Sequence, residues 1–412
     1  MLTVMHPEAA PLIEALAIGI LPIPIYSEDH SALAIKATKE FILTAKMRRG
    51  FKIYVSPISL PKAATIGLIS AFFDDEDEPL VIYTPLFDNE VSRLLLATLG
   101  NIEVDIYFFD EFSREWLSYV CKIQCPAETR DHLSGARLLK FAPGLQRSAV
   151  SQMPRWFGRR STLDDRLAIS VDFVEALVPE DQFILDSRPE NHSFRGGPFF
   201  SLTRLIREEP GADNEQEIAR LLKRLFSPES IYLNPLRAPD GREIADILIV
   251  TESDAVAIQA KDSPNTEASL NRTVDRKKRV TRKALSKATN QLQGAIRYLR
   301  SMPAVKMTVK GETTELELGQ RTLRGLILVK ELFNAEFSEY NRQILSMAHK
   351  LQVPCIVLDY PELLMYMTRL KSDKSFFEAF DRVYSIGVRT GQFPRLRIWP
   401  QGSFSEGGED LS

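Results

Sequence analysis

Three polar side chains interrupt two apolar segments that alternate as strands do, REIADILIV (242–250) and AVAIQAK (255–261). The first segment holds Asp246 among aliphatic residues, and the second ends on Gln259 and Lys261. Successive side chains of a strand point to opposite faces, so Gln259 and Lys261 share one face. Burying a carboxylate, an amide and an ammonium group without partners is costly. We therefore predict that the three groups meet in one pocket around a divalent cation.

A helix is expected directly before these strands. In EQEIARLLKRLF, apolar residues recur at helical spacing, and either Asp213 or Asn214 can cap the first turn, on which Glu215 would lie. The tight polar turn TESD joins the two strands as a hairpin. The plain alternative is a hairpin in which Asp246 and Lys261 form only an ion pair.

In this order along the chain, Glu215, Asp246 and the triplet Gln259, Ala260 and Lys261 resemble the core of the PD-(D/E)XK nuclease superfamily. Gln259 stands where that superfamily usually has an acidic residue. In this respect the chain is similar to its Mrr-like restriction endonuclease and nuclease-related branches. The resemblance implies a restriction-endonuclease-like domain, which is an α/β/α sandwich around a mixed central sheet.

The resemblance covers about residues 210–370, less than half of the chain, and departs from the family pattern in places. Ala245 replaces the eponymous proline, a common departure in that superfamily. The Mrr-like branches have an apolar residue three positions after their helix glutamate, as Ile218 follows Glu215. Glu217 competes with Glu215 for this role, and we favour Glu215.

The resemblance also implies a role for each residue. Asp246 would bind a metal ion directly together with the Gln259 side chain and the Ala260 carbonyl, and Glu215 would contribute directly or through water. Oxygen ligands of this kind suit Mg²⁺, with Mn²⁺ as a substitute. Lys261 would orient or deprotonate the attacking water and stabilise charge on the phosphate. The metal would act as a Lewis acid and lower the pKa of its bound water.

A basic segment follows at 272–300, with ten Lys or Arg residues and one acid, Asp275. Apolar residues from Leu285 to Leu299 keep helical spacing, so its last two-thirds is expected to be an amphipathic helix. Neutralising phosphates dominates DNA affinity, and the alternative is a merely solvated face. The resemblance also makes Gln291 a candidate for facing the site. The predicted nucleic-acid contacts are Arg276, Lys277, Lys278, Arg279, Arg282, Lys283 and Lys287.

Two further core strands are expected after the basic segment, RGLILVK (324–330) and VPCIVLDY (353–360). A helix is expected between them, at FSEYNRQILSMAHKL, and another after them, at PELLMYMTRL. This order suits an α/β/α sandwich. Asp359, at the end of a strand, is expected to be structural rather than catalytic.

The first half of the chain is expected to be mixed α/β. A helix should follow Asn89, and residues 111–120 also show helical spacing. Residues 143–166 interleave arginines with Trp156 and Phe157, which indicates either nucleic-acid binding or, more often, a surface loop with a packed anchor. Strands are predicted at 51–58, 65–73, 79–87 and 102–109.

The length of 412 residues favours two domains. The sequence loosens at 179–214, so we predict a mixed α/β domain over 1–200, the nuclease domain over 201–400 and a disordered tail over 401–412. The apolar run 9–25 is broken by prolines and lacks a basic start, so it predicts a short buried helix and an extended segment. We accordingly expect no membrane segment and a cytoplasmic location.

The functional expectation is a Mg²⁺-dependent endonuclease that hydrolyses DNA, in a setting of antiviral defence or a mobile element. With a net charge of −3, any DNA-binding surface must come from local clustering of charge. The alternatives are a catalytically silent nuclease fold that binds nucleic acid or regulates a partner, and a nuclease directed at RNA. Cutting two strands favours a homodimer, and an activating protein partner is a further option.

Overall fold

The chain divides into two compact units, Met1–Gln182 and Phe183–Arg397. The division falls inside the polar segment 179–214, ahead of the expected domain limit at residue 200. The tail predicted over 401–412 lies outside the described residues. The computed structural model describes residues 1–24, 31–60, 63–180, 183–209 and 211–395.

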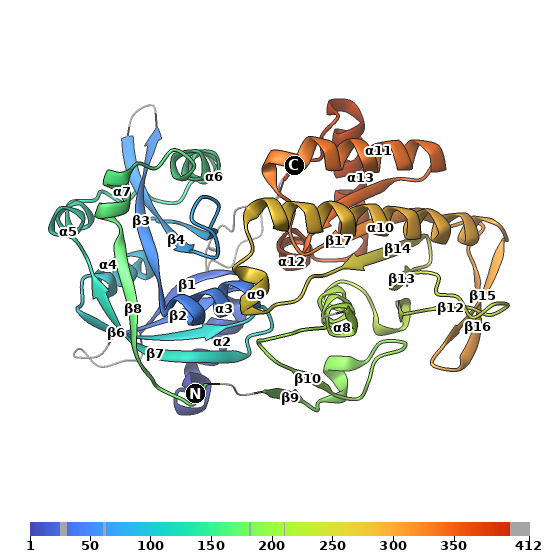
Figure 1. Cartoon of the computed structure of the whole chain (residues 1–412), viewed down its shortest axis with the longest axis horizontal. Helices are drawn as coiled ribbons and strands as arrows, with labels where there is room; N and C mark the ends of the chain where they lie inside the picture. Colours follow the sequence, from blue (N-terminus) through green and yellow to red (C-terminus); the bar gives the residue numbers. More distant parts are fainter. Residues whose placement is uncertain (25–30, 61–62, 181–182, 210, 396–412) are drawn as a thin grey trace. The chain divides into compact units, whose positions relative to one another are not determined.

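A mixed sheet of eight described strands forms the centre of the first unit (Figure 1). Its order is β1-β2-β6-β7-β8-β3-β4-β5, in which β2 and β6 run parallel and the other neighbours antiparallel. The strands are β1 (Gly19–Ile23), β2 (Ala32–Lys36), β3 (Gly50–Leu60), β4 (Ala63–Phe72), β5 (Leu80–Pro85), β6 (Glu103–Phe109), β7 (Glu115–Gln124) and β8 (Ile169–Ala176). The helices are α1 (Leu2–Met5), η1 (Pro7–Ala9), α2 (Ala10–Ala15), α3 (Lys39–Arg48), α4 (Glu90–Leu99), α5 (Ala127–Ser134), α6 (Pro143–Phe157) and α7 (Thr162–Leu167).

Most expected elements of the first unit are confirmed. The four predicted strands correspond to β3, β4, β5 and β6, and the run 9–25 contains α2 followed by β1. Asn89 caps α4, since its side chain accepts a hydrogen bond from the Ser92 amide at 2.8 Å. These elements were predictable because each has a local signal, either alternation or a cap.

Two expectations for the first unit are wrong. The helical spacing at 111–120 does not form a helix, because Glu115–Gln124 is the strand β7, paired on both sides with β6 and β8. Its apolar alternation continues to Ile123, beyond the window that suggested a helix. The loop expected at 143–166 is instead the helices α6 and α7, and Phe157 packs edge-on against Tyr54 with ring centroids 5.3 Å apart.

A five-stranded mixed sheet lies in the described part of the second unit, in the order β11-β13-β14-β17-β18. The β11, β13 and β14 strands are antiparallel neighbours, whereas β14, β17 and β18 run parallel. Helices pack on it from both sides: in Figure 1, α10 lies along one side of β13 and β14, and α8 lies on the other. The strands are β11 (Ile231–Leu233), β13 (Ile247–Val250), β14 (Asp254–Lys261), β17 (Thr322–Val329) and β18 (Cys355–Asp359).

The other elements of the second unit surround this sheet. Strand β12 joins a hairpin of β15 and β16 in a separate sheet. The smaller strands are β9 (Ile184–Asp186), β10 (Ser201–Thr203), β12 (Leu236–Arg237), β15 (Ala304–Val309) and β16 (Glu312–Glu317). The helices are η2 (Pro189–His192), α8 (Gly211–Leu222), η3 (Pro228–Ser230), α9 (Glu267–Leu270), α10 (Val274–Arg300), η4 (Asn334–Glu336), α11 (Phe337–Leu351), α12 (Tyr360–Arg369) and α13 (Asp373–Thr390).

The late strands and helices are confirmed where they were expected, as β17, α11, β18 and α12. Asp359 has the structural role predicted for it, because it caps α12 by accepting a hydrogen bond from the Glu362 amide at 3.1 Å. The apolar stripe of α10 is buried throughout, from Leu285 to Leu299. The helix itself is longer than expected and includes the whole basic segment from Val274.

Two local expectations near the candidate site are corrected. The first strand of the hairpin is shorter than the segment 242–250, since β13 begins at Ile247. Before it, the Asp246 carbonyl accepts from the Asn234 amide at 2.9 Å instead of pairing with β14. Helix α8 begins at Gly211, so Asp213 and Asn214 lie inside it and cannot cap its start.

Residues ahead of α8 are tied to the second unit by polar contacts. Strands β9 and β10 form an antiparallel two-stranded ribbon, hereafter the ribbon. Asp186 on the ribbon pairs with Arg220 of α8. In the segment that connects β9 and β10, the Arg195 amide donates a hydrogen bond to the carbonyl of Ile231, the first residue of β11, at 3.0 Å. These contacts explain why the second unit begins near residue 183.

Candidate active site

Asp246, Gln259 and Lys261 meet at the end of β14. Because Ile247 pairs with Ile258, the chain just before β13 lies beside Gln259. Lys261 Nζ lies 2.9 Å from Asp246 Oδ2, which also accepts a hydrogen bond from the Ala260 amide at 2.6 Å. Asp246 is 3% exposed and Gln259 is 2% exposed. The structure therefore brings the three predicted polar groups together in a buried position.

The Gln259 amide lies against the Asp246 carboxylate, and its two orientations differ in whether nitrogen or oxygen faces that carboxylate. The amide position nearest Asp246 is 3.3 Å from Oδ1 and 3.2 Å from Oδ2. With nitrogen in that position, Gln259 donates to the carboxylate, which satisfies both groups. With oxygen there, it accepts from Lys261 Nζ at 3.4 Å and gathers with the carboxylate oxygens. A bound cation would favour the second orientation, because only oxygen can be its ligand.

Lys261 links two of the oxygens that the sequence predicted as metal ligands. Its ammonium group donates to the Ala260 carbonyl at 2.9 Å as well as to Asp246 Oδ2 at the same distance. One positive group thus contacts both oxygens at once. This arrangement shows that the Asp246 and Ala260 oxygens point toward a common place where a cation can lie.

Glu215 faces this cluster from α8. Its Oε2 accepts a hydrogen bond from the Asn234 side chain at 3.0 Å. Burial and the negative charge of Asp246 raise the pKa of the Glu215 carboxyl, whereas the Asn234 hydrogen bond and the Lys261 charge lower it. The net effect is a raised pKa, and Glu215 interacts electrostatically with both Asp246 and Lys261.

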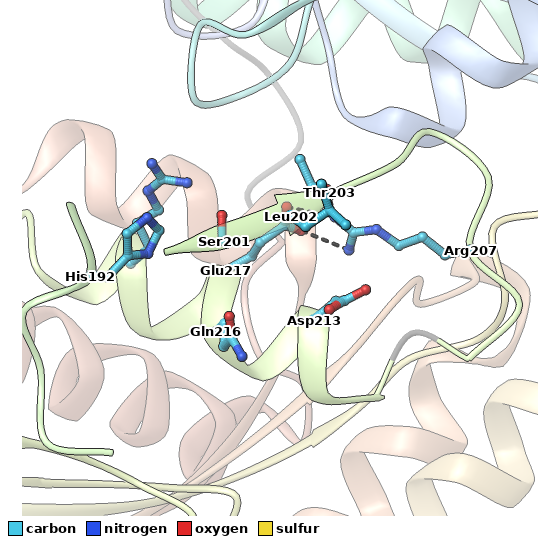
Figure 2. Close-up of a pocket in the computed structure, with 9 residues that line it drawn as sticks. His192, Ser201, Leu202, Thr203, Arg207, Asp213, Gln216 and Glu217 are labelled. Atoms are coloured by element: carbon cyan, nitrogen blue, oxygen red, sulfur yellow. Dashed lines mark hydrogen bonds and ion pairs between the residues drawn. The ribbon is translucent and has the colours of Figure 1, made fainter. Parts of the chain in front are cut away.

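Glu217 has a different environment from Glu215. Two residues apart on a helix, their side chains point in nearly opposite directions. Glu217 is buried and forms a two-pronged ion pair with Arg207, at 2.7 Å and 2.9 Å, while Arg207 also donates to Thr203 at 2.6 Å (Figure 2). The carboxylate of Glu217 is therefore occupied by a structural ion pair, which favours Glu215 as the helix carboxylate of the site.

Glu243 belongs to the same group of charges, and sequence reasoning missed it. Burial, a hydrogen bond to Asp246 and the negative charges of Asp246 and Glu215 raise the pKa of the Glu243 carboxyl to about 7. Glu243 is exposed as a residue, so solvent screens part of this effect. A strand over 242–250 would have put Glu243 and Asp246 on opposite faces. The irregular backbone before Ile247 brings them together instead.

Only some of the oxygens in this cluster that suit a hard cation belong to carboxylates. Among the residues that the structure describes, no three His, Cys, Asp or Glu side chains gather closely enough to hold a metal ion. A cation here would depend on Asp246, the Gln259 amide oxygen, the Ala260 carbonyl and water. Mg²⁺ commonly binds through one or two carboxylates and retains several waters, so this donor set is chemically suitable.

The basic start of α10 lies at the same end of the sheet as Lys261. Since β14 and β17 are parallel and α10 lies between them in sequence, α10 must begin where β14 ends. Arg282 pairs with Glu336 at 3.3 Å, and Lys278 lies over the Phe333 ring. Lys277 and Lys278 are half-buried. The exposed predicted DNA contacts are Arg276, Arg279, Arg282, Lys283 and Lys287.

Gln291 lies farther along α10 and is exposed. None of the contacts described for the cluster involves it. The structure thus gives Gln291 no place in the candidate site, unlike the other predicted residues.

A pocket on α8 is separate from this cluster. Asp213, Gln216, Glu217 and Arg220 recur at helical spacing and line it, together with His192 and residues of the ribbon (Figure 2). Glu215 is not among the lining residues, because it lies on the other side of the helix. The candidate site is therefore the buried cluster at the end of β14 and not this pocket.

Comparison with known proteins adds no family to these observations. No protein-family model matches the sequence, and no curated protein matches it significantly. Among the described residues, no helix is both long enough and apolar enough to cross a membrane.

Proposed function

We propose that this protein is a metal-dependent nuclease that hydrolyses DNA phosphodiester bonds, with Mg²⁺ as its cofactor and Mn²⁺ as a substitute. The observation that carries the proposal is the buried meeting of Asp246, Gln259 and Lys261 at the end of β14, with Glu215 facing them from α8. A mere ion pair would explain Asp246 and Lys261. It would not explain why the buried Gln259 amide lies against Asp246, or why Glu215 and Glu243 interact electrostatically with that carboxylate.

The fold of the second unit supports the same proposal. A restriction-endonuclease-like domain should have a mixed sheet with helices on both sides, and the order β11-β13-β14-β17-β18 with α8 and α10 has this character. The proposed site lies where β14 ends and where the basic helix begins. Exposed lysines and arginines at that end would hold the phosphate backbone beside the cluster.

The proposed roles follow from the positions of the side chains. Asp246, the Gln259 amide oxygen and the Ala260 carbonyl would hold the metal ion, which when bound supplies Lewis acidity and a more acidic water. Glu215 would hold water at the opposite side of the cluster. Lys261 would release the Ala260 carbonyl and turn its ammonium group toward the phosphate, where it stabilises the charge that develops during attack.

Cleavage assays with the whole chain test this function. Supercoiled plasmid, single-stranded DNA and RNA should be incubated with EDTA, Ca²⁺, Mg²⁺ or Mn²⁺. We expect DNA cutting with Mg²⁺ or Mn²⁺ and none with EDTA. Cutting of RNA alone would correct the substrate, whereas binding without cutting in every metal would indicate a catalytically silent protein or one that needs an activating partner.

A further inference from the structure

The ribbon of β9 and β10 has its polar face turned inward and its apolar face turned outward. Asp186 on the inner face pairs with Arg220 of α8, and Thr203 accepts a hydrogen bond from Arg207. On the other face, Leu185 and Leu202 are register partners, so their side chains lie next to each other. They are 56% and 44% exposed. A ribbon normally buries its apolar face, so this arrangement calls for a partner on the outer side.

The apolar outer face extends beyond the two leucines. Phe183 lies directly before β9, and Phe200 lies directly before β10. They are 59% and 56% exposed, and Phe199 and Ile206 beside them are 81% and 42% exposed. At about 200 Å² for a large side chain, the exposed area of these six residues is roughly 600–700 Å². This exceeds the largest apolar patch of a typical monomer.

We propose that a second copy of this chain covers the outer face of the ribbon. A dimer with two-fold symmetry uses the same surface on both copies, so two such faces can pack with Leu185 of each copy against Leu202 of the other. The apolar area approaches the ~800 Å² that each partner contributes to a stable interface. Exposed charges of both signs follow β10 and would pair across the two-fold axis of the dimer, and they are Arg204, Glu208 and Glu209.

The inference goes beyond the proposed nuclease activity, because it concerns the oligomeric state of the protein. Sedimentation velocity of the whole chain at increasing micromolar concentrations should show a species with twice the mass of one chain. Leu185→Asp and Leu202→Asp would each place an unpaired charge in the interface. Each should raise the dissociation constant of the dimer at least tenfold, which corresponds to about 1.4 kcal/mol.

Val388→Asp is the matched control, since Val388 is 60% exposed on α13, away from the ribbon in sequence. It should leave the dimer intact, and circular dichroism should show native helix content in all three variants. A monomeric wild type would overturn the inference. If Leu202→Asp also lowers the unfolding temperature of that monomer, another part of the same chain covers the face. A dimer that survives both leucine variants would equally overturn it.

Discussion

Lys261 and a metal ion compete for the same oxygens in the proposed site. The ammonium group contacts Asp246 Oδ2 and the Ala260 carbonyl, each at 2.9 Å. A divalent cation bound to these oxygens would repel the lysine from them. In the proposed mechanism the displaced lysine would then face the phosphate, so its present contacts would belong to the metal-free form of the site.

Glu243 should make metal binding depend on pH near neutrality. Its pKa of about 7 means that the carboxyl is mostly neutral at pH 6 and mostly charged at pH 8. A charged carboxylate attracts the cation, so we expect Mg²⁺ affinity to rise by up to about tenfold between these values. Glu243→Gln should remove most of this rise. Isothermal titration calorimetry at both pH values measures it.

The same group sets a pH dependence of stability in the absence of metal. The folded state holds this proton more tightly than the unfolded state does, because the pKa of an ordinary glutamate carboxyl is 4.5. The contribution of Glu243 to stability is therefore full below pH 4.5 and is lost as pH rises toward 7. In EDTA, the unfolding temperature of Glu243→Gln should fall less over this window than that of wild type. Equal slopes for both proteins would contradict the raised pKa.

At the scale of elements, the proposed chemical role of α8 and its structural role lie on opposite faces of the helix. Its one face presents Glu215 to the cluster, and its opposite face presents Glu217 to Arg207 and the ribbon. A single helix thus fixes the position of the carboxylate while an ion pair anchors the helix. The two glutamates are expected to respond differently to the same substitution.

Glu215→Gln and Glu217→Gln form a matched pair of variants on α8. Glu215→Gln should lower cleavage with little change in stability, because Asn234 can still hydrogen-bond to the amide. Glu217→Gln leaves the buried Arg207 without its counter-charge and should cost about 3 kcal/mol of stability. Urea unfolding and cleavage rates measure the two effects. Loss of activity from Glu217→Gln alone, with stability intact, would reverse our assignment.

Helix α10 should bind DNA through its exposed basic residues without reading sequence. Lys283 and Lys287 are exposed on α10. Replacing either one by Ala should weaken binding to all DNA sequences alike and reduce the salt slope of the affinity by about one. Fluorescence anisotropy at several salt concentrations provides the slope. Lys306→Ala is a suitable control that should leave the slope unchanged, because Lys306 is an exposed residue of β15.

Local sequence patterns predicted the helices and strands well, but they did not predict contacts between residues that are distant in sequence. The hairpin of β13 and β14 and the stripe of α10 are visible as alternation and helical spacing. The ion pair of Glu217 with Arg207 is not, since nothing in the sequence connects an arginine in an irregular segment to a helix ten residues later. Glu243 was hidden because regular strand geometry was assumed over 242–250, whereas β13 begins only at Ile247.

At the scale of the whole molecule, the proposed chemistry lies in one unit. Every residue of the cluster and of the basic helix belongs to Phe183–Arg397. The chain has a net charge of −3, so attraction to DNA must come from the local face formed by α10. If the ribbon joins two copies, the dimer carries two sites, which is the number needed to cut both strands of a duplex.

The most direct test compares Mg²⁺ binding and plasmid cleavage in wild type, Asp246→Asn and Lys261→Met, with circular dichroism as the check on folding. Asp246→Asn should lose both metal binding and cleavage. Lys261→Met should bind Mg²⁺ at least as tightly as wild type, because a competitor is removed, yet cleave at least about 100-fold more slowly. Full cleavage by a folded Asp246→Asn protein would contradict the proposed site.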